Sequence, residues 1–259
     1  MLQQPSNIKD QFLKTTEEIV IEISDLSKSF GKNNHVLKGV NFRVNRGENL
    51  VVLGKSGSGK SITIKCLVGL VEADKGSIKV FDTDITSLNE FELNKVRIRI
   101  GFLFQNAALY DSMTVRENLA FPLLRHSKNL SSVDAEAAII ESLNSVGLAE
   151  AIDKMPSELS GGMRKRIGLA RTLILKPEII LYDEPTTGLD TITSREISEL
   201  ILAIQKKNKT TSIIITHDMA CAKLTADRII ILKDGIIDAE GSYEELEKSE
   251  DEWVRSFFI

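Results

Sequence analysis

The sequence lacks any apolar run long enough to cross a membrane. A spanning helix needs about 20 consecutive, mainly apolar residues, and charged residues interrupt every hydrophobic stretch of this chain sooner than that. The opening stretch MLQQPSNIKDQFLKTTEE also lacks the basic and apolar regions of a secretion signal. We therefore expect a protein that stays in the cytosol and has no span of its own.

The sequence also has few cysteines and no excess of positive charge. The chain has two cysteines, Cys66 and Cys221, which are too few for a disulfide framework and lack the spacing of metal ligands. We interpret both as small buried apolar residues. The formal net charge of -4 and the pI of about 5.6 do not match the basic excess of nucleic-acid-binding domains, so we expect no nucleic-acid partner. Internal repeats are absent as well, which excludes solenoid folds.

Two kinds of strand pattern are present. Apolar and polar residues alternate in residues 18–23 and 36–44, as in half-exposed strands of an antiparallel sheet. Short continuous apolar runs, typical of strands buried on both faces, follow at residues 49–53, 99–104, 178–182, 211–216 and 228–232. Helical stretches separate several of these runs, which predicts a parallel sheet covered by helices.

The strand patterns disappear between residues 106 and 175. Helix-forming stretches such as residues 131–147 replace them, with Ser131 and Asp134 placed for a capping box. This predicts a helical subdomain inserted into the core. After the core resumes, residues 233–235 indicate a hairpin turn before a last strand at 236–238, and residues 242–245 the start of a short helix.

The segment GKSGSGKS, residues 54–61, matches the phosphate-loop pattern G-x-x-x-x-G-K-[ST]. An apolar strand precedes it and a helix follows, and this context argues against a turn that matches by chance. Glycines let the backbone N–H groups surround the β-phosphate at a helix N-terminus. Lys60 is predicted to reach the β- and γ-phosphate oxygens, and the Ser61 hydroxyl to bind Mg²⁺.

Polar residues follow three of the buried strands. Asp183 and Glu184 directly follow the run at 178–182, at the carboxyl edge where parallel sheets bind ligands. We predict that Asp183 holds the Mg²⁺ shell and that Glu184 polarises the attacking water. His217 is predicted to bond the γ-phosphate or this water, although a single histidine is more often structural. Gln105 is interpreted as a third catalytic residue, a sensor that ligates Mg²⁺ or bridges the attacking water, or else as an ordinary loop residue.

A second glycine pair stands in LSGGM, residues 159–163, and opens a predicted helix over residues 163–175. Ser160 and two glycines at a helix N-terminus form an anion site. A nucleotide has one triphosphate, however, and the first loop already surrounds it. Either the segment only caps its helix, or it faces a phosphate that is bound elsewhere.

These motifs and their order resemble the nucleotide-binding subunit of ABC transporters, and the resemblance covers about residues 19–241. It implies an α/β P-loop NTPase fold with a mixed sheet flanked by helices, an antiparallel β subdomain and an inserted helical subdomain. The implied organisation is an arm at 1–18, an ATPase domain at 19–241 and a helical tail at 242–259. Within the domain, the RecA-like core is 19–105 and 176–241, and the helical insert is 106–175.

The resemblance also resolves the second glycine pair. In this family two copies pack head to tail, so that the signature loop of one copy covers the ATP of the other. Asp190 matches the residue that communicates between the two sites, and Phe30 matches the aromatic that stacks on adenine, where Tyr is more common. The implied cofactors are ATP and Mg²⁺, and the implied nucleotide contacts are Phe30, Gly54, Ser56, Gly57, Ser58, Gly59, Lys60, Ser61, Ile62, Ser160, Gly161, Gly162 and Asp190.

Met163 departs from the Gln that the family usually has at this position. Together with residues 106–127, 154–166 and 253–258, it resembles the ATPases of MCE-linked, Mla-type lipid transporters. This implies a homodimer on the cytoplasmic face of the inner membrane, bound to permease subunits and an MCE-domain protein. A methionine-type importer is the alternative, although its ATPase usually extends well past the last strand. DNA-repair and translation ATPases of the ABC type are disfavoured, because they carry coiled-coil inserts, zinc-binding cysteine pairs or two cassettes.

The tail segment EWVRSFFI, residues 252–259, concentrates apolar side chains near one end of the sequence. One interpretation is that it folds back on its own core. The other is that it packs on the partner subunit or on a small accessory protein.

Overall fold

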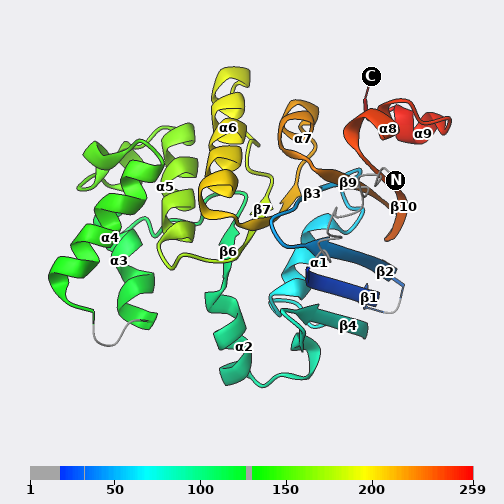
Figure 1. Cartoon of the computed structure of the whole chain (residues 1–259), viewed down its shortest axis with the longest axis horizontal. Coiled ribbons are helices and arrows are strands. Elements are labelled where there is room, and N and C mark those ends of the chain that lie inside the picture. The colour runs from blue at the N-terminus through cyan, green and yellow to red at the C-terminus, as the bar shows by residue number, and fades with distance from the viewer. Residues whose placement is uncertain (1–17, 32, 127–129, 259) are drawn as a thin grey trace, which may run out of the picture.

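The computed structural model describes residues 18–31, 33–126 and 130–258, which form two sheets and a group of helices (Figure 1). The predicted N-terminal arm lies outside the described residues, apart from Glu18. Within these ranges, no helix is both long and apolar enough to cross a membrane.

The larger sheet has six strands in the order β10-β9-β3-β8-β7-β6. Its strands are β3 (Asn49–Leu53), β6 (Ile100–Leu103), β7 (Ile179–Asp183), β8 (Thr211–Ile215), β9 (Arg228–Lys233) and β10 (Ile236–Gly241). Strands β3, β6, β7, β8 and β9 are parallel and correspond to the five continuous apolar runs, while β10 is antiparallel to β9. Asp234 and Gly235 have positive φ angles, 51° and 86°, as a two-residue hairpin turn requires. The predicted mixed sheet is confirmed.

The smaller sheet is antiparallel, in the order β2-β1-β4-β5. Its strands are β1 (Ile19–Ser29), β2 (His35–Asn45), β4 (Lys75–Val80) and β5 (Thr83–Asp84). The alternating patterns predicted β1 and β2 but missed β4 and β5. β4 has a weak pattern, since only Ile78 and Val80 are buried in it.

The helices are α1 (Lys60–Leu67), α2 (Glu90–Ile98), α3 (Val115–His126), α4 (Ser132–Ser145), α5 (Gly161–Leu173), α6 (Thr191–Asn208), α7 (Met219–Thr225), α8 (Tyr243–Glu247) and α9 (Glu252–Arg255). Short 3-10 turns lie at η1 (Ile85–Ser87), η2 (Ala149–Ala151) and η3 (Pro156–Glu158). In the described parts of 106–175 there are helices and turns but no strand. Figure 1 shows α3, α4 and α5 together at one end of the molecule and the antiparallel sheet toward the other.

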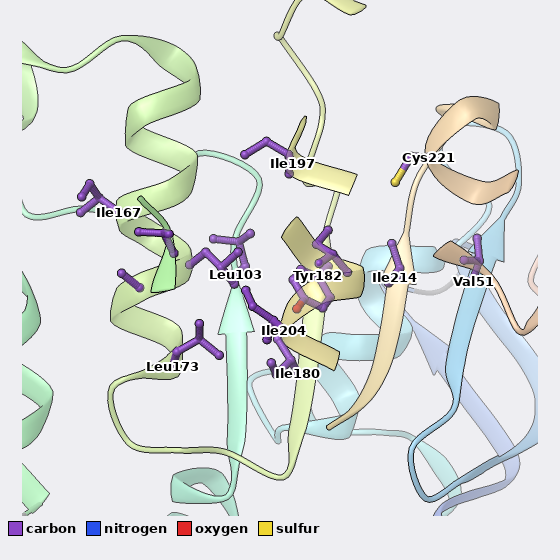
Figure 2. Close-up of a cluster of buried hydrophobic side chains, with 14 of the residues drawn as sticks. Val51, Leu103, Ile167, Leu173, Ile180, Tyr182, Ile197, Ile204, Ile214 and Cys221 are labelled. Carbon is purple, nitrogen blue, oxygen red and sulfur yellow. The ribbon is translucent and has the colours of Figure 1, made fainter. Parts of the chain in front are cut away.

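Both faces of the six-stranded sheet are buried, which explains the continuous apolar runs. Val51 of β3 and Ile180 of β7 point into a core shared with α3 to α7 (Figure 2), whereas Leu50 and Leu181 point into a second core shared with α1 and the antiparallel sheet. The two predicted buried cysteines are confirmed as free and buried, and burial raises the pKa of each thiol to about 11.

Candidate nucleotide site

The phosphate loop runs from Gly54 to Gly59, between the end of β3 and the start of α1. Gly54 and Gly59 have φ angles of 150° and 109°, which disfavour any residue with a Cβ. A Cβ on Gly54 would lie 2.3 Å from the carbonyl oxygen of Leu232. The glycine pattern in this loop is therefore a requirement of the backbone path, which brings the loop to the N-terminus of α1.

Lys60 is the first residue of α1, and its side chain returns over the loop. It is only 8% exposed, and its Nζ donates hydrogen bonds to the carbonyl oxygens of Gly54 at 2.7 Å and Lys55 at 3.1 Å. Burial lowers the pKa of Lys60. Both acceptors are neutral, so this cation has no carboxylate bonded to it within the described residues, and a phosphate would supply the missing charge.

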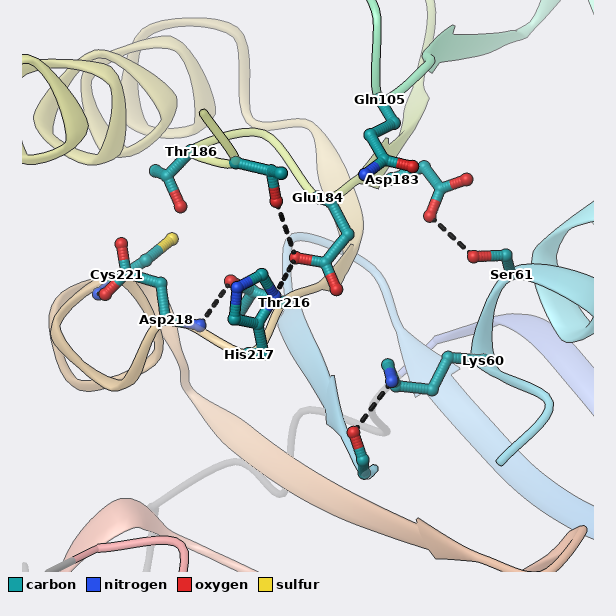
Figure 3. A network of polar contacts seen from close by, with 12 residues as sticks. Lys60, Ser61, Gln105, Asp183, Glu184, Thr186, Thr216, His217, Asp218 and Cys221 are labelled. Atoms are coloured by element: carbon teal, nitrogen blue, oxygen red, sulfur yellow. Dashed lines mark hydrogen bonds and ion pairs between the residues drawn. The ribbon is translucent and has the colours of Figure 1, made fainter. Parts of the chain in front are cut away.

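Ser61 and Asp183 meet although they are far apart in the sequence. The Ser61 hydroxyl donates a 2.8 Å hydrogen bond to Oδ1 of Asp183, the last residue of β7. Figure 3 shows Gln105 on the same side of the site. A hydroxyl, a carboxylate and an amide are the hard oxygen donors that Mg²⁺ prefers. No cluster of three His, Cys, Asp or Glu side chains that could hold a metal ion exists among the described residues.

Glu184 directly follows β7 and has an unusual backbone. Its φ angle of 53° is in the left-handed region, which non-glycine residues rarely adopt. Its side chain is 13% exposed, and Oε2 accepts hydrogen bonds from His217 Nδ1 at 2.7 Å and Thr187 Oγ1 at 3.2 Å (Figure 3). Two donors thus orient one carboxylate oxygen and leave the other open to a water molecule.

A cavity of about 910 Å³ opens over these residues. It is lined by Phe30, Asn34, Val36, Gly54, Lys55, Ser56, Gly57, Gly59, Lys60, Ser61, Ile62, Gln105, Glu184, His217 and Phe257. Most of the predicted nucleotide contacts and the three predicted catalytic residues are therefore brought together. Ser58 and Asp183 are buried in the wall rather than lining it. Asn34, Val36, Lys55 and Phe257 were not predicted from the sequence.

Ser160, Gly161, Gly162 and Asp190 do not line this cavity. Ser160 is the N-cap of α5, and its Oγ accepts a 3.2 Å hydrogen bond from the N–H of Met163. The helix begins at Gly161, two residues before the predicted start. Asp190 is the N-cap of α6 and accepts from the N–H of Thr193 at 3.0 Å. The capping interpretation of Ser160 is thus correct for the isolated chain, and its phosphate interpretation requires a second copy.

Gly162 explains why these two helix starts lie side by side. A Cβ at Gly162 would stand 2.6 Å from Cγ2 of Thr193 in the first turn of α6. Because only a hydrogen fits there, α5 and α6 approach each other closely at their N-termini. The signature loop and Asp190 therefore form one surface.

Lys165 is a site residue that sequence analysis missed. It is 5% exposed, and its Nζ donates hydrogen bonds to the backbone oxygens of Gln105 at 2.5 Å and Glu184 at 2.9 Å. Burial lowers the pKa of Lys165 to about 8. The only signal in the sequence is the three-residue spacing of Lys165, Gly168 and Arg171, which places neighbouring members about 60° apart around α5.

Comparisons with known proteins assign the family. A family model described as ABC transporter matches residues 37–187, more than half of the chain, including the phosphate loop and the acidic pair after β7. The chain belongs to the ABC transporter family. As an ABC cassette it is an ATP-binding ATPase, which confirms the predicted reaction.

Three similar curated proteins cover most of this cassette. Protein TRIGALACTOSYLDIACYLGLYCEROL 3 of Arabidopsis thaliana is 38% identical over 96% of the cassette and 76% of that protein. The probable ribonucleotide transport ATP-binding protein mkl of Mycobacterium leprae is 40% identical over 92% of the cassette and 68% of that protein. The methionine import ATP-binding protein MetN of Rhizobium etli is 40% identical over 86% and 61%, respectively. These names agree on no single cargo.

Solved structures of ABC cassettes confirm the fold. The ATP-binding cassette MJ0796, a dimer in a post-hydrolysis state bound to ADP and Pi, has a TM-score of 0.79 and 31% identity, over 86% of this cassette and 98% of that chain. The cbiO1 protein of Clostridium perfringens, part of the transporter complex cbiONQ, has a TM-score of 0.82 and 28% identity, over 93% and 94%.

The C-terminal tail folds back on its own cassette. Trp253 packs edge-on against Phe257 with ring centroids 5.0 Å apart, and Phe258 packs against Tyr243 at the same distance. Phe257 also lines the nucleotide cavity. The tail therefore follows the first of its two interpretations, and a partner protein at this tail stays a prediction. Ile259 lies outside the described residues.

Phe257→Ala is expected to weaken ATP binding roughly two- to tenfold, because an aromatic contact contributes about 0.5–1.5 kcal/mol. Titration with a fluorescent ATP analogue measures the change. Phe258→Ala is the matched control, since Phe258 packs on Tyr243 and does not line the cavity. It should lower the melting temperature without changing the affinity. Wild-type affinity in the Phe257 variant would show that the tail does not contribute to nucleotide binding.

Proposed function

We propose that this cassette binds and hydrolyses MgATP as a homodimer that drives a phospholipid transporter of the MCE-linked type. The proposed dimer is supported by the positions of the site residues, some of which line the cavity while others lie outside it. Lys60, Glu184 and His217 line the chain's own cavity, whereas Ser160 and Asp190 lie outside it on another surface. A second copy packed head to tail supplies the missing phosphate contacts.

Each resident residue has a distinct task in the proposed reaction. Lys60 binds the β- and γ-phosphate oxygens, and the phosphate-loop N–H groups orient the triphosphate for in-line attack. Ser61, Asp183 and Gln105 would hold Mg²⁺, which would neutralise charge on the phosphates. Glu184 accepts a proton from the attacking water. His217 keeps that carboxylate in place through its Nδ1–H, and Nε2–H of the protonated imidazole then donates to the γ-phosphate.

The signature residues complete the site in trans. Ser160, Gly161 and Gly162 of one copy bind the γ-phosphate held by the other copy, through the hydroxyl and the N–H groups at the start of α5. ATP then favours the closed dimer, because its triphosphate contacts both copies, and ADP does not. Hydrolysis reopens the dimer. Membrane permease subunits on the cytoplasmic face of the inner membrane convert this cycle into transport, with an MCE-domain protein as the lipid carrier.

The lipid assignment is supported by sequence rather than by the nucleotide site. Residues 106–127, 154–166 and 253–258 resemble Mla-type ATPases, and one relative is named for trigalactosyldiacylglycerol, which is a lipid. The second candidate is a methionine-type importer, favoured by the 40% identity to MetN. The two candidates differ in cargo and share the ATPase mechanism.

A transport assay separates these two candidates. The cassette is purified together with the membrane subunits that bind it and reconstituted into vesicles. We expect ATP-dependent transfer of a fluorescent phospholipid between donor and acceptor vesicles and no ATP-dependent uptake of radiolabelled methionine. Ser160→Arg, which blocks the signature loop sterically, should abolish the transfer. Methionine uptake without lipid transfer would establish the importer instead.

A further inference from the structure

The inward face of α5 is built as a clamp on the segment that follows β6. Lys165 donates to the backbone oxygen of Gln105. Gly168 faces Ala107, where a Cβ on the glycine would be 2.8 Å from that of the alanine. Arg171 donates to the backbone oxygens of Ala107 at 3.0 Å and Ala108 at 2.8 Å. Three positions of one helix, which together span less than two turns, thus contact Gln105, Ala107 and Ala108 of one loop.

The clamped segment is strained. Ala107 and Ala108 have φ angles of 58° and 50°, both in the left-handed region that residues with a Cβ adopt at a cost. Such a conformation persists only where its surroundings determine it. Arg171 binds the carbonyl oxygens of both strained residues, and Lys165 binds that of Gln105 just before them, so α5 stabilises this path of the loop.

Lys165 alone extends the clamp to the catalytic strand. Its Nζ also donates a 2.9 Å hydrogen bond to the backbone oxygen of Glu184, itself in the left-handed region at φ 53°. The N–H of Glu184 donates to Ile215 of β8 at 2.9 Å. The peptide groups on the two sides of Glu184 are therefore held by different elements, one by the sheet and the other by α5.

Stability does not explain a lysine at this position. Lys165 is 5% exposed and donates only to neutral carbonyl oxygens, and burial lowers its pKa by more than the nearby Glu184 and Asp183 carboxylates raise it. A buried cation with neutral partners costs more free energy than an apolar side chain of the same length. A methionine would fill the same space at lower cost, so what the lysine adds is its bonds to two separate loops.

We propose that Lys165 is a positioning residue for ATP hydrolysis, which locks the peptides of Gln105 and Glu184 in register with the signature helix. α5 is capped by Ser160, the residue that faces the partner's nucleotide in the proposed dimer. A shift of α5 on nucleotide binding therefore moves Nζ of Lys165 and, through it, the base at Glu184. This inference rests on the proposed role of Glu184.

Lys165→Met tests the inference in steady-state ATPase assays of the full chain. The variant keeps the side-chain length and loses the donors. We expect kcat to fall about 10- to 100-fold, because a misplaced base is costly, while KM for ATP changes less than about threefold. Lys165→Arg keeps a donor group and should recover most of the lost rate. Arg171→Met is the matched control, since it frees the same loop but not Glu184, and should lose much less.

A double-mutant cycle with Glu184→Gln separates positioning from a general structural role. If Lys165 acts through Glu184, adding Lys165→Met to Glu184→Gln lowers the residual rate no further. The inference would be overturned if the rate losses of the two single variants multiplied in the double variant. It would also be overturned if Lys165→Met raised KM and left kcat unchanged. Thermal melting verifies that each variant is folded, and Lys165→Gln replaces the methionine variant if that one is not. Full turnover in Glu184→Gln alone would instead refute the proposed base.

Discussion

Glu184→Gln is expected to reduce the rate of ATP turnover by about 100-fold or more, the usual contribution of a general base. The amide is isosteric and still accepts from His217 and Thr187, so the side chain keeps its place. It cannot take up the proton of the attacking water. Phosphate release from the purified cassette measures the loss.

The same variant should accumulate a MgATP-bound dimer, because nucleotide binding is intact while the step that reopens the dimer is blocked. Size-exclusion chromatography with and without ATP detects that dimer. Glu141→Gln is the control, since Glu141 lies on α4 away from the cavity, paired only with Lys176. It should have wild-type turnover. Turnover in the Glu184 variant equal to that of this control would show that another group is the base.

Lys60→Ala is expected to weaken ATP binding itself, by about 10- to 100-fold. A charge-assisted hydrogen bond contributes about 1.5–3 kcal/mol. Lys60 is the cation whose side chain lies over the phosphate loop and donates to its backbone. Isothermal titration with ATP measures the dissociation constant. Turnover at saturating ATP should fall too, since charge on the γ-phosphate also grows during the reaction.

The neighbouring lysine provides the control for this variant. Lys55 lines the same cavity but has an exposed side chain, and only its backbone oxygen contacts Lys60. Lys55→Ala should therefore change the affinity for ATP less than about threefold, the scale of an exposed charge. Equal losses in the two variants would mean that the cavity attracts the nucleotide by overall charge rather than through Lys60.

The parts of the site that could be predicted are those held together by adjacent residues. The phosphate loop is one continuous segment whose glycines, lysine and serine act on one phosphate group, so its geometry is local. Asp183 and Glu184 were placed correctly because they follow a strand that could be read from four consecutive apolar residues. His217 follows β8 in the same way, and neighbouring parallel strands end at the same edge.

Local sequence patterns also gave a wrong boundary for one helix and missed one strand. The start of α5 was expected at Met163, since glycines are poor helix formers, but Ser160 caps the helix and Gly161 and Gly162 lie inside it. The reason is tertiary, because only a glycine lets α5 approach Thr193 of α6 so closely. The strand β4 was missed because its few buried residues are too sparse to form a recognisable alternation.

The sequence by itself determined the motifs of this protein: a phosphate loop, an acidic pair and a histidine at strand ends, and a glycine pair that we propose faces a second copy. Only the tertiary structure decided which groups surround them. Lys165 reaches a carbonyl 60 residues away, and Phe257 reaches the cavity from the far end of the chain. Contacts across such separations depend on how helices and sheets pack, and packing depends on side chains of many elements at once. A motif, in contrast, carries its geometry within a few residues.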